Sequence, residues 1–189
     1  MTLHLLPSIA QSSHARIVCT TSCFHFPGIF DLNDFNGEKI RTGQSGVQYY
    51  MNNKLYYQIW LTELQHRLLK IEKYKHIIIN GVHPGYVNTG VWQLQDGRIR
   101  NMFIGSLLRF LASWMGLTPE QGSLAITHAA SSADAGKAGG RYFNRIEEDE
   151  PMPHTKDPDC RMRVWRKVND ELKLEQKGLL DVVGLEYMA

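Results

Sequence analysis

Residues 76–89, HIIINGVHPGYVNT, decide the fold of this chain. The segment opens with a short apolar run rich in β-branched residues, and the turn-forming pair Pro84-Gly85 ends that run. Such a run predicts a buried β-strand over residues 76–82. Because ligands in open α/β sheets bind beyond the carboxyl ends of the strands, the polar residues that follow become candidates for a binding site.

A second strand and a long helix precede this segment. Residues 16–20, RIVCT, form another β-branched apolar run, of the kind that is buried on both faces in a parallel sheet. Residues 26–46 are rich in Gly, Asn and Asp, which predicts a long loop. Between residues 46 and 74 apolar side chains recur at steps of three and four residues, and this periodicity predicts one long helix.

The rest of the chain continues the alternation of helices and strands. The apolar pattern of residues 99–115 predicts an amphipathic helix. Thr118 and Pro119 indicate the start of another helix, which runs to about residue 131. Gln121 is placed as in a capping box at its start. We expect a strand at residues 141–144, irregular structure at 147–160 and a final helix at 160–174. This order of elements predicts an α/β fold with a parallel sheet and right-handed crossovers.

Composition narrows the class of protein. The chain has 189 residues, 43% of them apolar and 21% charged, which is typical of one folded domain. A net charge of +2 gives no reason to expect nucleic acid or an anionic membrane as a partner. Cys19, Cys23 and His25 lack the further ligands of a metal site, so no metal is expected. No apolar stretch is long enough to span a membrane and no signal peptide is recognised, so the expected setting is cytoplasmic.

Tyr50 and Lys54 stand four residues apart on the predicted long helix and therefore share one of its faces. An ammonium group beside a phenol favours the phenolate, so a tyrosine in this position can give or take a proton near neutral pH. A pair with this spacing also occurs by chance on exposed helices, and the spacing alone does not separate the two explanations.

Further polar and turn residues follow the two predicted strands. Ser22 directly follows the first strand, and Gly85 and Thr89 follow the second. A serine hydroxyl could donate a hydrogen bond to a substrate carbonyl, a glycine would let a ligand approach the backbone, and a threonine hydroxyl could bind a phosphate or an amide. Each residue also has an ordinary explanation as part of a loop or a tight turn. Together with the tyrosine and lysine, however, they are expected at the same end of one sheet.

In order and context, RIVCTTS (residues 16–22), YMNNK (50–54) and NGVHPGYVNT (80–89) are similar to the motifs of the short-chain dehydrogenase/reductase family. Residues 117–132 and 139–143 resemble the retinol-dehydrogenase-like branch of that family. The resemblance implies an oxidoreductase that reduces a ketone or oxidises a secondary alcohol with NADP(H) or NAD(H) as cofactor.

The same resemblance assigns roles to individual residues. It implies that Ser22 orients the substrate carbonyl, that Tyr50 is the proton donor, and that Lys54 favours the tyrosine phenolate and binds the nicotinamide ribose. Residues 99–115 would form a lid over the substrate. The residues that would contact the nicotinamide end of the cofactor, besides the tyrosine and the lysine, are Pro84, Gly85, Val87 and Thr89.

The N-terminal part departs from the family pattern. Residues 1–15 contain neither the Gly-rich turn that holds a pyrophosphate nor the family's catalytic asparagine. The expected fold is therefore the C-terminal part of a Rossmann-like, doubly wound parallel sheet that lacks the N-terminal βαβ dinucleotide-binding half. It would be one partial domain, truncated at its N-terminus, with its core at residues 5–145 and an irregular segment and helix at 146–189. Residues 16–20 would then form an exposed sheet edge, which predicts self-association or dependence on a second chain.

Three functions remain open from the sequence. The first is an oxidoreductase that acts on a small-molecule carbonyl or alcohol. The second is a cofactor-free acid/base enzyme, such as an isomerase, a dehydratase or a cyclase, that uses Tyr50 and Lys54. The third is a non-catalytic truncated remnant, or a subunit that binds a partner through the exposed edge.

Overall fold

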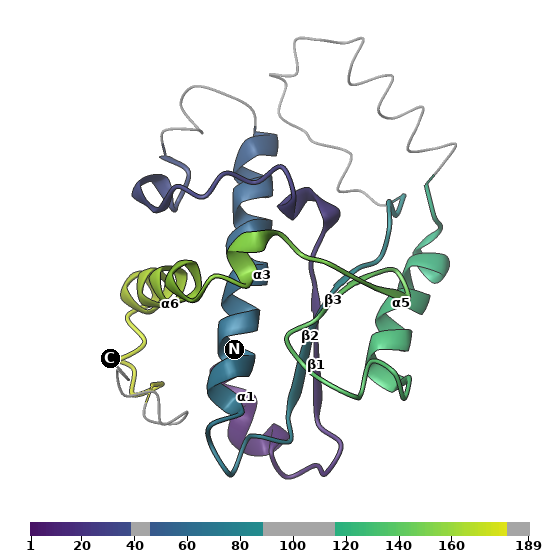
Figure 1. Ribbon diagram of the computed structural model, residues 1–189, viewed down its shortest axis with the longest axis horizontal. Coiled ribbons are helices and arrows are strands. Elements are labelled where there is room, and N and C mark those ends of the chain that lie inside the picture. The colour runs from purple at the N-terminus through teal and green to yellow at the C-terminus, as the bar shows by residue number, and fades with distance from the viewer. Residues whose placement is uncertain (39–45, 89–115, 181–189) are drawn as a thin grey trace.

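The computed structural model describes residues 1–38, 46–88 and 116–180 and contains a mixed sheet (Figure 1). The strands follow one another across this sheet in chain order, and the first three are parallel to one another while the fourth is antiparallel to the third. The four strands are β1 (Arg16–Thr20), β2 (Ile78–His83), β3 (Tyr142–Asn144) and β4 (Glu147–Asp149). The predicted α/β class with a largely parallel sheet is confirmed.

Helices cover both faces of the sheet. The long helix α3 packs on one face and α5 on the other, with α6 on the far side of α3, so the described chain forms layers (Figure 1). The α-helices are α1 (Thr2–Ile9), α3 (Gly46–Leu68), α5 (Pro119–Ser131) and α6 (Pro158–Leu172), and short 3-10 turns lie at η1 (Cys23–His25), η2 (Leu32–Asp34) and η4 (Pro153–Thr155). None of the helices in these described ranges is long and apolar enough to cross a membrane.

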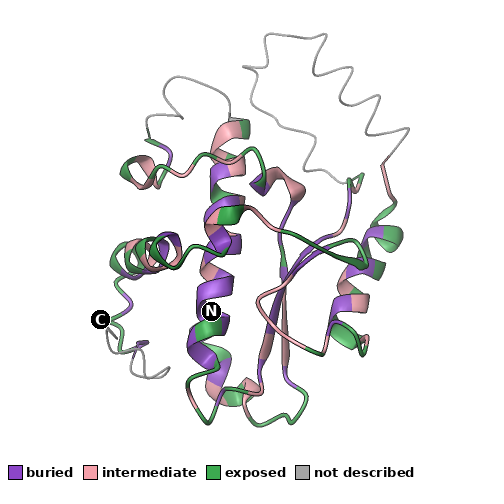
Figure 2. Cartoon of the chain, in the orientation of Figure 1, coloured by how far each residue is buried: buried purple, intermediate pink, exposed green. Residues whose placement is uncertain are grey.

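The side chains of the strands alternate between two cores. Ile79 is fully buried in a cluster with Leu61 and Leu64 of α3, whereas Val82, three residues further along β2 and therefore on the opposite face, packs with Ala125 of α5. Figure 2 shows that buried residues concentrate along α3 and on the inner side of α5, and exposed residues on the outer sides of α5 and α6. The period of two along a strand thus divides the apolar residues between the helix layers.

The start of α5 agrees with its sequence pattern in detail. The Thr118 hydroxyl accepts a hydrogen bond from the Gln121 backbone N–H at 3.3 Å, and the Gln121 side-chain oxygen accepts one from the Thr118 N–H at 2.9 Å. This is the reciprocal capping box that the two residues predict. The long helix, in contrast, ends at Leu68 rather than at residue 74, because the chain turns through bonds such as Tyr74 N–H to Ile71 O at 2.8 Å.

Two further predictions differ from the structure. Residues 147–149, where irregular structure was expected, form β4 after a reversal at Arg145, whose φ is +62°. The three residues of this strand are all exposed, so no apolar alternation marks them in the sequence. The run RIVCT does form β1 but is only half-buried over Arg16–Val18, because β1 lies at one end of the described sheet. The helix expected at 99–115 falls outside the described residues.

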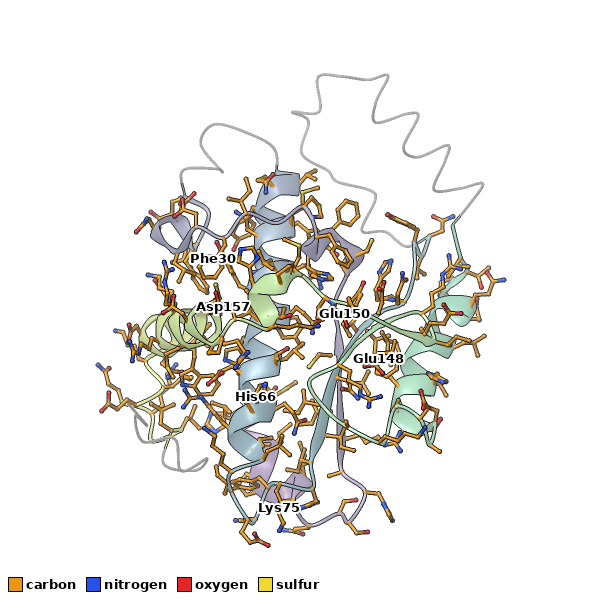
Figure 3. The ribbon with its side chains drawn as sticks, in the orientation of Figure 1. Phe30, His66, Lys75, Glu148, Glu150 and Asp157 are labelled. Carbon is orange, nitrogen blue, oxygen red and sulfur yellow. The ribbon has the colours of Figure 1, made fainter. Side chains whose placement is uncertain are left out.

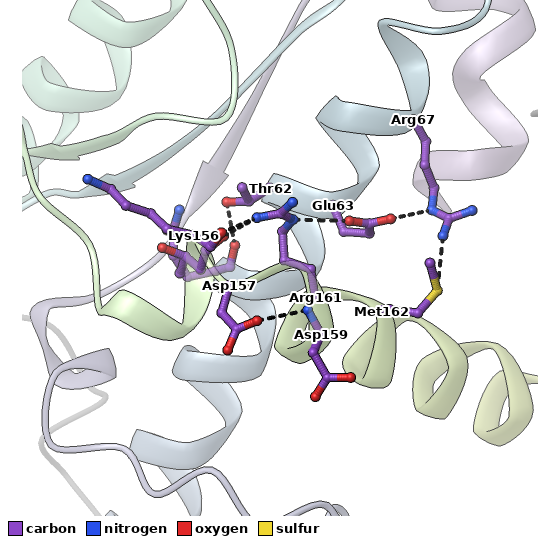
Figure 4. A network of polar contacts seen from close by, with 10 residues as sticks. Thr62, Glu63, Arg67, Lys156, Asp157, Asp159, Arg161 and Met162 are labelled. Carbon is purple, nitrogen blue, oxygen red and sulfur yellow. Dashed lines mark hydrogen bonds and ion pairs between the residues drawn. The ribbon is translucent and has the colours of Figure 1, made fainter. Parts of the chain in front are cut away.

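A buried carboxylate fastens α6 to α3. One Glu63 oxygen accepts a hydrogen bond from Arg67 Nε at 2.7 Å, and the other accepts one from Arg161 Nε at 3.2 Å (Figure 4). The Arg161 guanidinium also donates to the Lys156 carbonyl at 2.7 Å, so α6 is held through its first turn. Trp165 of α6 adds an apolar contact, since its ring stacks on that of Trp60 with the centroids 6.0 Å apart.

We expect the substitution Glu63→Ala to lower the free energy of unfolding by about 3–5 kcal/mol, because it leaves two largely buried guanidinium groups without their shared carboxylate. Urea denaturation monitored by tryptophan fluorescence measures this loss. Glu72→Ala is the matched control: Glu72 forms an exposed ion pair with Lys75, which Figure 3 labels away from α6, and its loss should cost less than about 1 kcal/mol. Equal losses for the two variants would contradict a structural role for the Glu63 network.

Candidate active site

A cavity of about 620 Å³ opens at the carboxyl ends of β1 and β2. It lies against the N-terminal part of α3 on one side and the start of α5 on the other. Six of the seven site residues expected from the sequence line it, namely Ser22, Tyr50, Lys54, Pro84, Gly85 and Val87. Thr89, the seventh, lies outside the described residues, as does the expected lid at 99–115.

Ser22 is held in place by its own local structure. It is the N-cap of η1, and its hydroxyl oxygen accepts a hydrogen bond from the Phe24 backbone N–H at 3.2 Å. Its carbonyl lies 2.7 Å from Nδ1 of His25, which is fully buried. Ser22 lines the cavity with only 4% of its surface exposed, and because its hydroxyl oxygen accepts the Phe24 bond, the hydroxyl proton can still be donated to a ligand.

The tyrosine and the lysine are brought together as their spacing predicts. The Lys54 ammonium lies 5.5 Å from the centroid of the Tyr50 ring and donates a hydrogen bond to the Thr20 carbonyl at 3.1 Å. Burial lowers the pKa of the Lys54 ammonium from its usual range. Tyr50 remains 39% exposed, with its ring edge-to-face against Phe24 at 5.9 Å. The phenol is therefore accessible from the cavity while the cation beside it is fixed to the end of β1.

The turn after β2 brings bare backbone to the cavity. Gly85 has a φ of +93°, a conformation that side chains rarely adopt, and a Cβ atom there would come within 2.7 Å of the Leu117 side chain. The segment is then pinned to the residue before α5, because Val87 and Leu117 form an isolated parallel bridge. Gly122 allows this approach, since a Cβ atom there would overlap Val87. Both glycines of this region therefore allow close packing of neighbouring side chains.

His83, the last residue of β2, also lines the cavity, and the sequence analysis gave it no role. Burial, followed by the nearby charges of Arg145, His25 and Lys54, lowers the pKa of His83 to about 4. Its imidazole is therefore neutral at physiological pH and adds a polar group without a charge. Its place directly before the Pro-Gly turn was the one signal in the sequence that could have identified it.

A thiol and a phenol meet beside the cavity and were likewise missed. The Cys23 thiol donates a hydrogen bond to the Tyr86 phenolic oxygen at 3.4 Å, and this contact raises the pKa of Tyr86 to about 12. The Tyr86 ring also lies edge-to-face with Phe24 at 6.2 Å. Within residues 1–38, 46–88 and 116–180, no three His, Cys, Asp or Glu side chains gather into a cluster that could hold a metal ion.

This arrangement suits proton transfer at an oxygen atom. A fixed hydroxyl, an accessible phenol and a partly desolvated ammonium surround one cavity, and an uncharged imidazole lies beside them. Such groups can hold a carbonyl or alcohol oxygen and exchange a proton with it.

Comparison with known proteins finds two curated dehydrogenases. The chain is 28% identical to a polyprenol dehydrogenase of Mus musculus over 99% of its own length and 53% of that protein. It is 27% identical to a polyprenol dehydrogenase of Homo sapiens over 89% of its own length and 46% of that protein. The chain thus spans about half the length of the curated relatives it matches. No family model matches it.

A solved structure shares the fold. An uncharacterised protein from Mycobacterium paratuberculosis superposes with a TM-score of 0.54 at 20% identity, over 84% of this chain and 50% of that one. At this identity the similarity concerns the fold alone. The ordered motifs and the mostly parallel α/β sheet of this chain are similar to those of the short-chain dehydrogenase/reductase family, and the two curated relatives are dehydrogenases.

Proposed function

We propose that this chain carries the acid/base half of a nicotinamide-dependent oxidoreductase that interconverts an alcohol and its carbonyl compound. The observation that supports this most directly is that Ser22, Tyr50 and Lys54 line one cavity at the carboxyl ends of two parallel strands. Their order in the chain and their placement agree with the family's motif set. The dehydrogenase names of the two curated relatives support the same class of reaction.

In the reductive direction, the Tyr50 phenol donates its proton to the carbonyl oxygen of the substrate. The Lys54 ammonium, fixed by the Thr20 carbonyl at 3.1 Å, stabilises the phenolate that this leaves. The Ser22 hydroxyl accepts a bond from the Phe24 N–H and uses its own proton to hold the same substrate oxygen. NADP(H) or NAD(H), when bound, supplies the hydride that the carbonyl carbon accepts. The alcohol oxidation runs through the same groups in reverse.

We further propose that the substrate is a long apolar alcohol. Besides its polar groups, the cavity is lined by apolar side chains from several elements, including Phe24, Val47, Val87 and Ile126. An apolar wall of this kind favours a hydrocarbon chain next to a single polar end that meets the hydroxyl and the phenol. The curated relatives are named for polyprenol, a long isoprenoid alcohol, which agrees with this chemistry.

A partner-binding role is the second candidate, and the position of β1 favours it. The strand lies at one end of the described sheet, and Ile17 and Val18 are only half-buried there. An apolar strand with an unpaired side tends to associate with another polypeptide. We propose a second copy of the chain, or a separate chain, as that partner. Light scattering that finds a stable monomer would count against this candidate.

For the oxidoreductase, we expect Tyr50→Phe to lower kcat/KM by about 10²–10⁴-fold, because the substitution removes only the hydroxyl that transfers the proton. The change in nicotinamide absorbance with a panel of alcohols and carbonyl compounds measures it. Tyr49→Phe is the matched control, since Tyr49 lies on the same helix but packs against Gly37 outside the cavity.

The same assay separates the alternatives. Turnover by the intact chain that needs no nicotinamide, but is lost in Tyr50→Phe, would indicate a cofactor-free acid/base enzyme instead. Neither turnover nor nicotinamide binding by the intact chain would defeat the oxidoreductase proposal for this polypeptide.

A second prediction concerns the apolar wall. Phe24→Ala should raise KM for farnesol by roughly tenfold or more and change KM for the short alcohol prenol much less, because truncating an apolar wall costs about 1–3 kcal/mol of binding to a chain that touches it. Steady-state kinetics with both alcohols measures the difference. Phe26→Ala is the control, because Phe26 stacks on His25 rather than lining the cavity. A parallel loss for both alcohols would show that the ring supports the site without selecting the chain.

A further inference from the structure

The face of α3 that lies against the sheet is polar over two successive turns. Lys54 and Gln58 are four residues apart, so Gln58 lies one helical turn behind the lysine, deeper between the helix and the strands. The Gln58 side chain is fully buried, with 0% exposed. An uncharged amide at such a position is stable only where its oxygen and its NH₂ group find hydrogen-bond partners.

Three buried polar atoms in this region have no such partner. Neither Oε1 nor Nε2 of Gln58 makes a hydrogen bond to any residue in the described part of the chain, and the same holds for Oγ1 of Thr21. Thr21 is 2% exposed and follows β1 directly. These atoms are therefore shielded from bulk solvent as well as from protein partners.

Gly81 of β2 places the two side chains next to each other. A Cβ atom built on Gly81 would overlap Gln58 Oε1 and would lie 3.0 Å from Cγ2 of Thr21. Both side chains therefore border the same point above the strand, and they reach it from α3 and from the end of β1. The missing side chain of the glycine makes room for the Gln58 amide, which any other residue at this position would displace.

Gln65 gives an internal comparison on the same helix. It is also buried, at 2% exposed, but its Nε2 donates to the Ile77 carbonyl at 3.1 Å and its Oε1 accepts from the Ile79 N–H at 2.7 Å. The helix can thus satisfy a buried glutamine with backbone groups of β2 where the geometry allows it. Gln58 has the same chemistry two turns away and lacks those contacts.

We propose that Gln58 and Thr21 together bind an internal water molecule beside Gly81, one helical turn behind Lys54. Folded proteins hold about one buried water per 27 residues, mostly where two to four otherwise unpaired polar groups converge. A water at this point can donate to Gln58 Oε1 and accept from Gln58 Nε2 or Thr21 Oγ1–H. The site is separate from the groups that transfer the proton, and it does not depend on the reaction proposed above.

The test uses near-isosteric substitutions in the full chain. With a bound water, Thr21→Val and Gln58→Met each lower Tm by roughly 2–4 °C, because each leaves the water and the other side chain with fewer partners. The double variant then loses less than the sum of the two, since it removes the whole polar site. Without the water, the native atoms are unpaired, and each substitution leaves Tm unchanged or raises it.

Gln65→Met controls for the sensitivity of the measurement, because it removes two hydrogen bonds to β2 and must lower Tm in either case. Thr21→Val is the milder of the two changes and decides the question if Gln58→Met does not fold. A drop in Tm for Thr21→Val, with a crystal structure showing a water bonded to Thr21 and Gln58, supports the proposal. A Tm equal to or above that of the native chain, or a dry site in that crystal structure, overturns it.

Discussion

The hydrogen bond from the Lys54 ammonium to the Thr20 carbonyl joins α3 to the last residue of β1. Because this contact fixes the N-terminal half of α3 over the carboxyl end of the sheet, Tyr50 and Ser22 reach the same cavity although 27 residues lie between them in the sequence. The Thr20 carbonyl, which accepts this bond, belongs to the last residue of β1. It therefore lies at the edge of the sheet where the parallel strands have their carboxyl ends. Fold and candidate chemistry therefore depend on one cation held at the junction of a helix and a strand.

Several polar side chains are buried along α3, although this helix packs on a sheet. The Thr62 hydroxyl donates to the Gln58 carbonyl at 2.9 Å, and the Gln65 amide donates to the backbone next to β2. The Glu63 carboxylate accepts hydrogen bonds from two arginines, one of which lies on α6. The contacts of Gln65 and of Glu63 with Arg161 fix the helix against the sheet and against α6, whereas the Thr62 bond lies within α3 itself. Apolar packing alone would tolerate small shifts along the helix axis, whereas directional bonds do not. These contacts hold the second half of α3, and the Lys54 bond to Thr20 holds the first half, which carries Tyr50.

Much of the framework followed from the sequence, and the failures have identifiable causes. The predicted bounds of β1 are those of the structure, because a short β-branched run strongly favours a strand. The capping box of α5 was also predicted correctly, because two side chains close together in the sequence define it. The strand β4 was missed because its pairing comes from the reversal at Arg145 rather than from its own exposed residues.

The candidate site was predicted less completely than the fold. Its motif residues were found because their spacing and order carry a pattern, but the neutral state of His83 arises from burial and from charges on distant segments of the chain. The burial of the His83 imidazole near cationic groups is a property of the folded chain. No periodic pattern in the sequence indicates it. The same applies to Gln58, which is indistinguishable in the sequence from Gln65 seven residues later.

The pairing of Tyr86 and Asn88 with Leu117 has a consequence for substitutions at these positions. The Leu117 N–H donates to the Tyr86 carbonyl at 2.7 Å, and the Asn88 N–H donates to the Leu117 carbonyl at 2.9 Å. Because backbone groups make both bonds, the bonds do not depend on which side chains stand at these positions. The turn at Gly85 and the start of α5 therefore stay joined when those side chains are substituted.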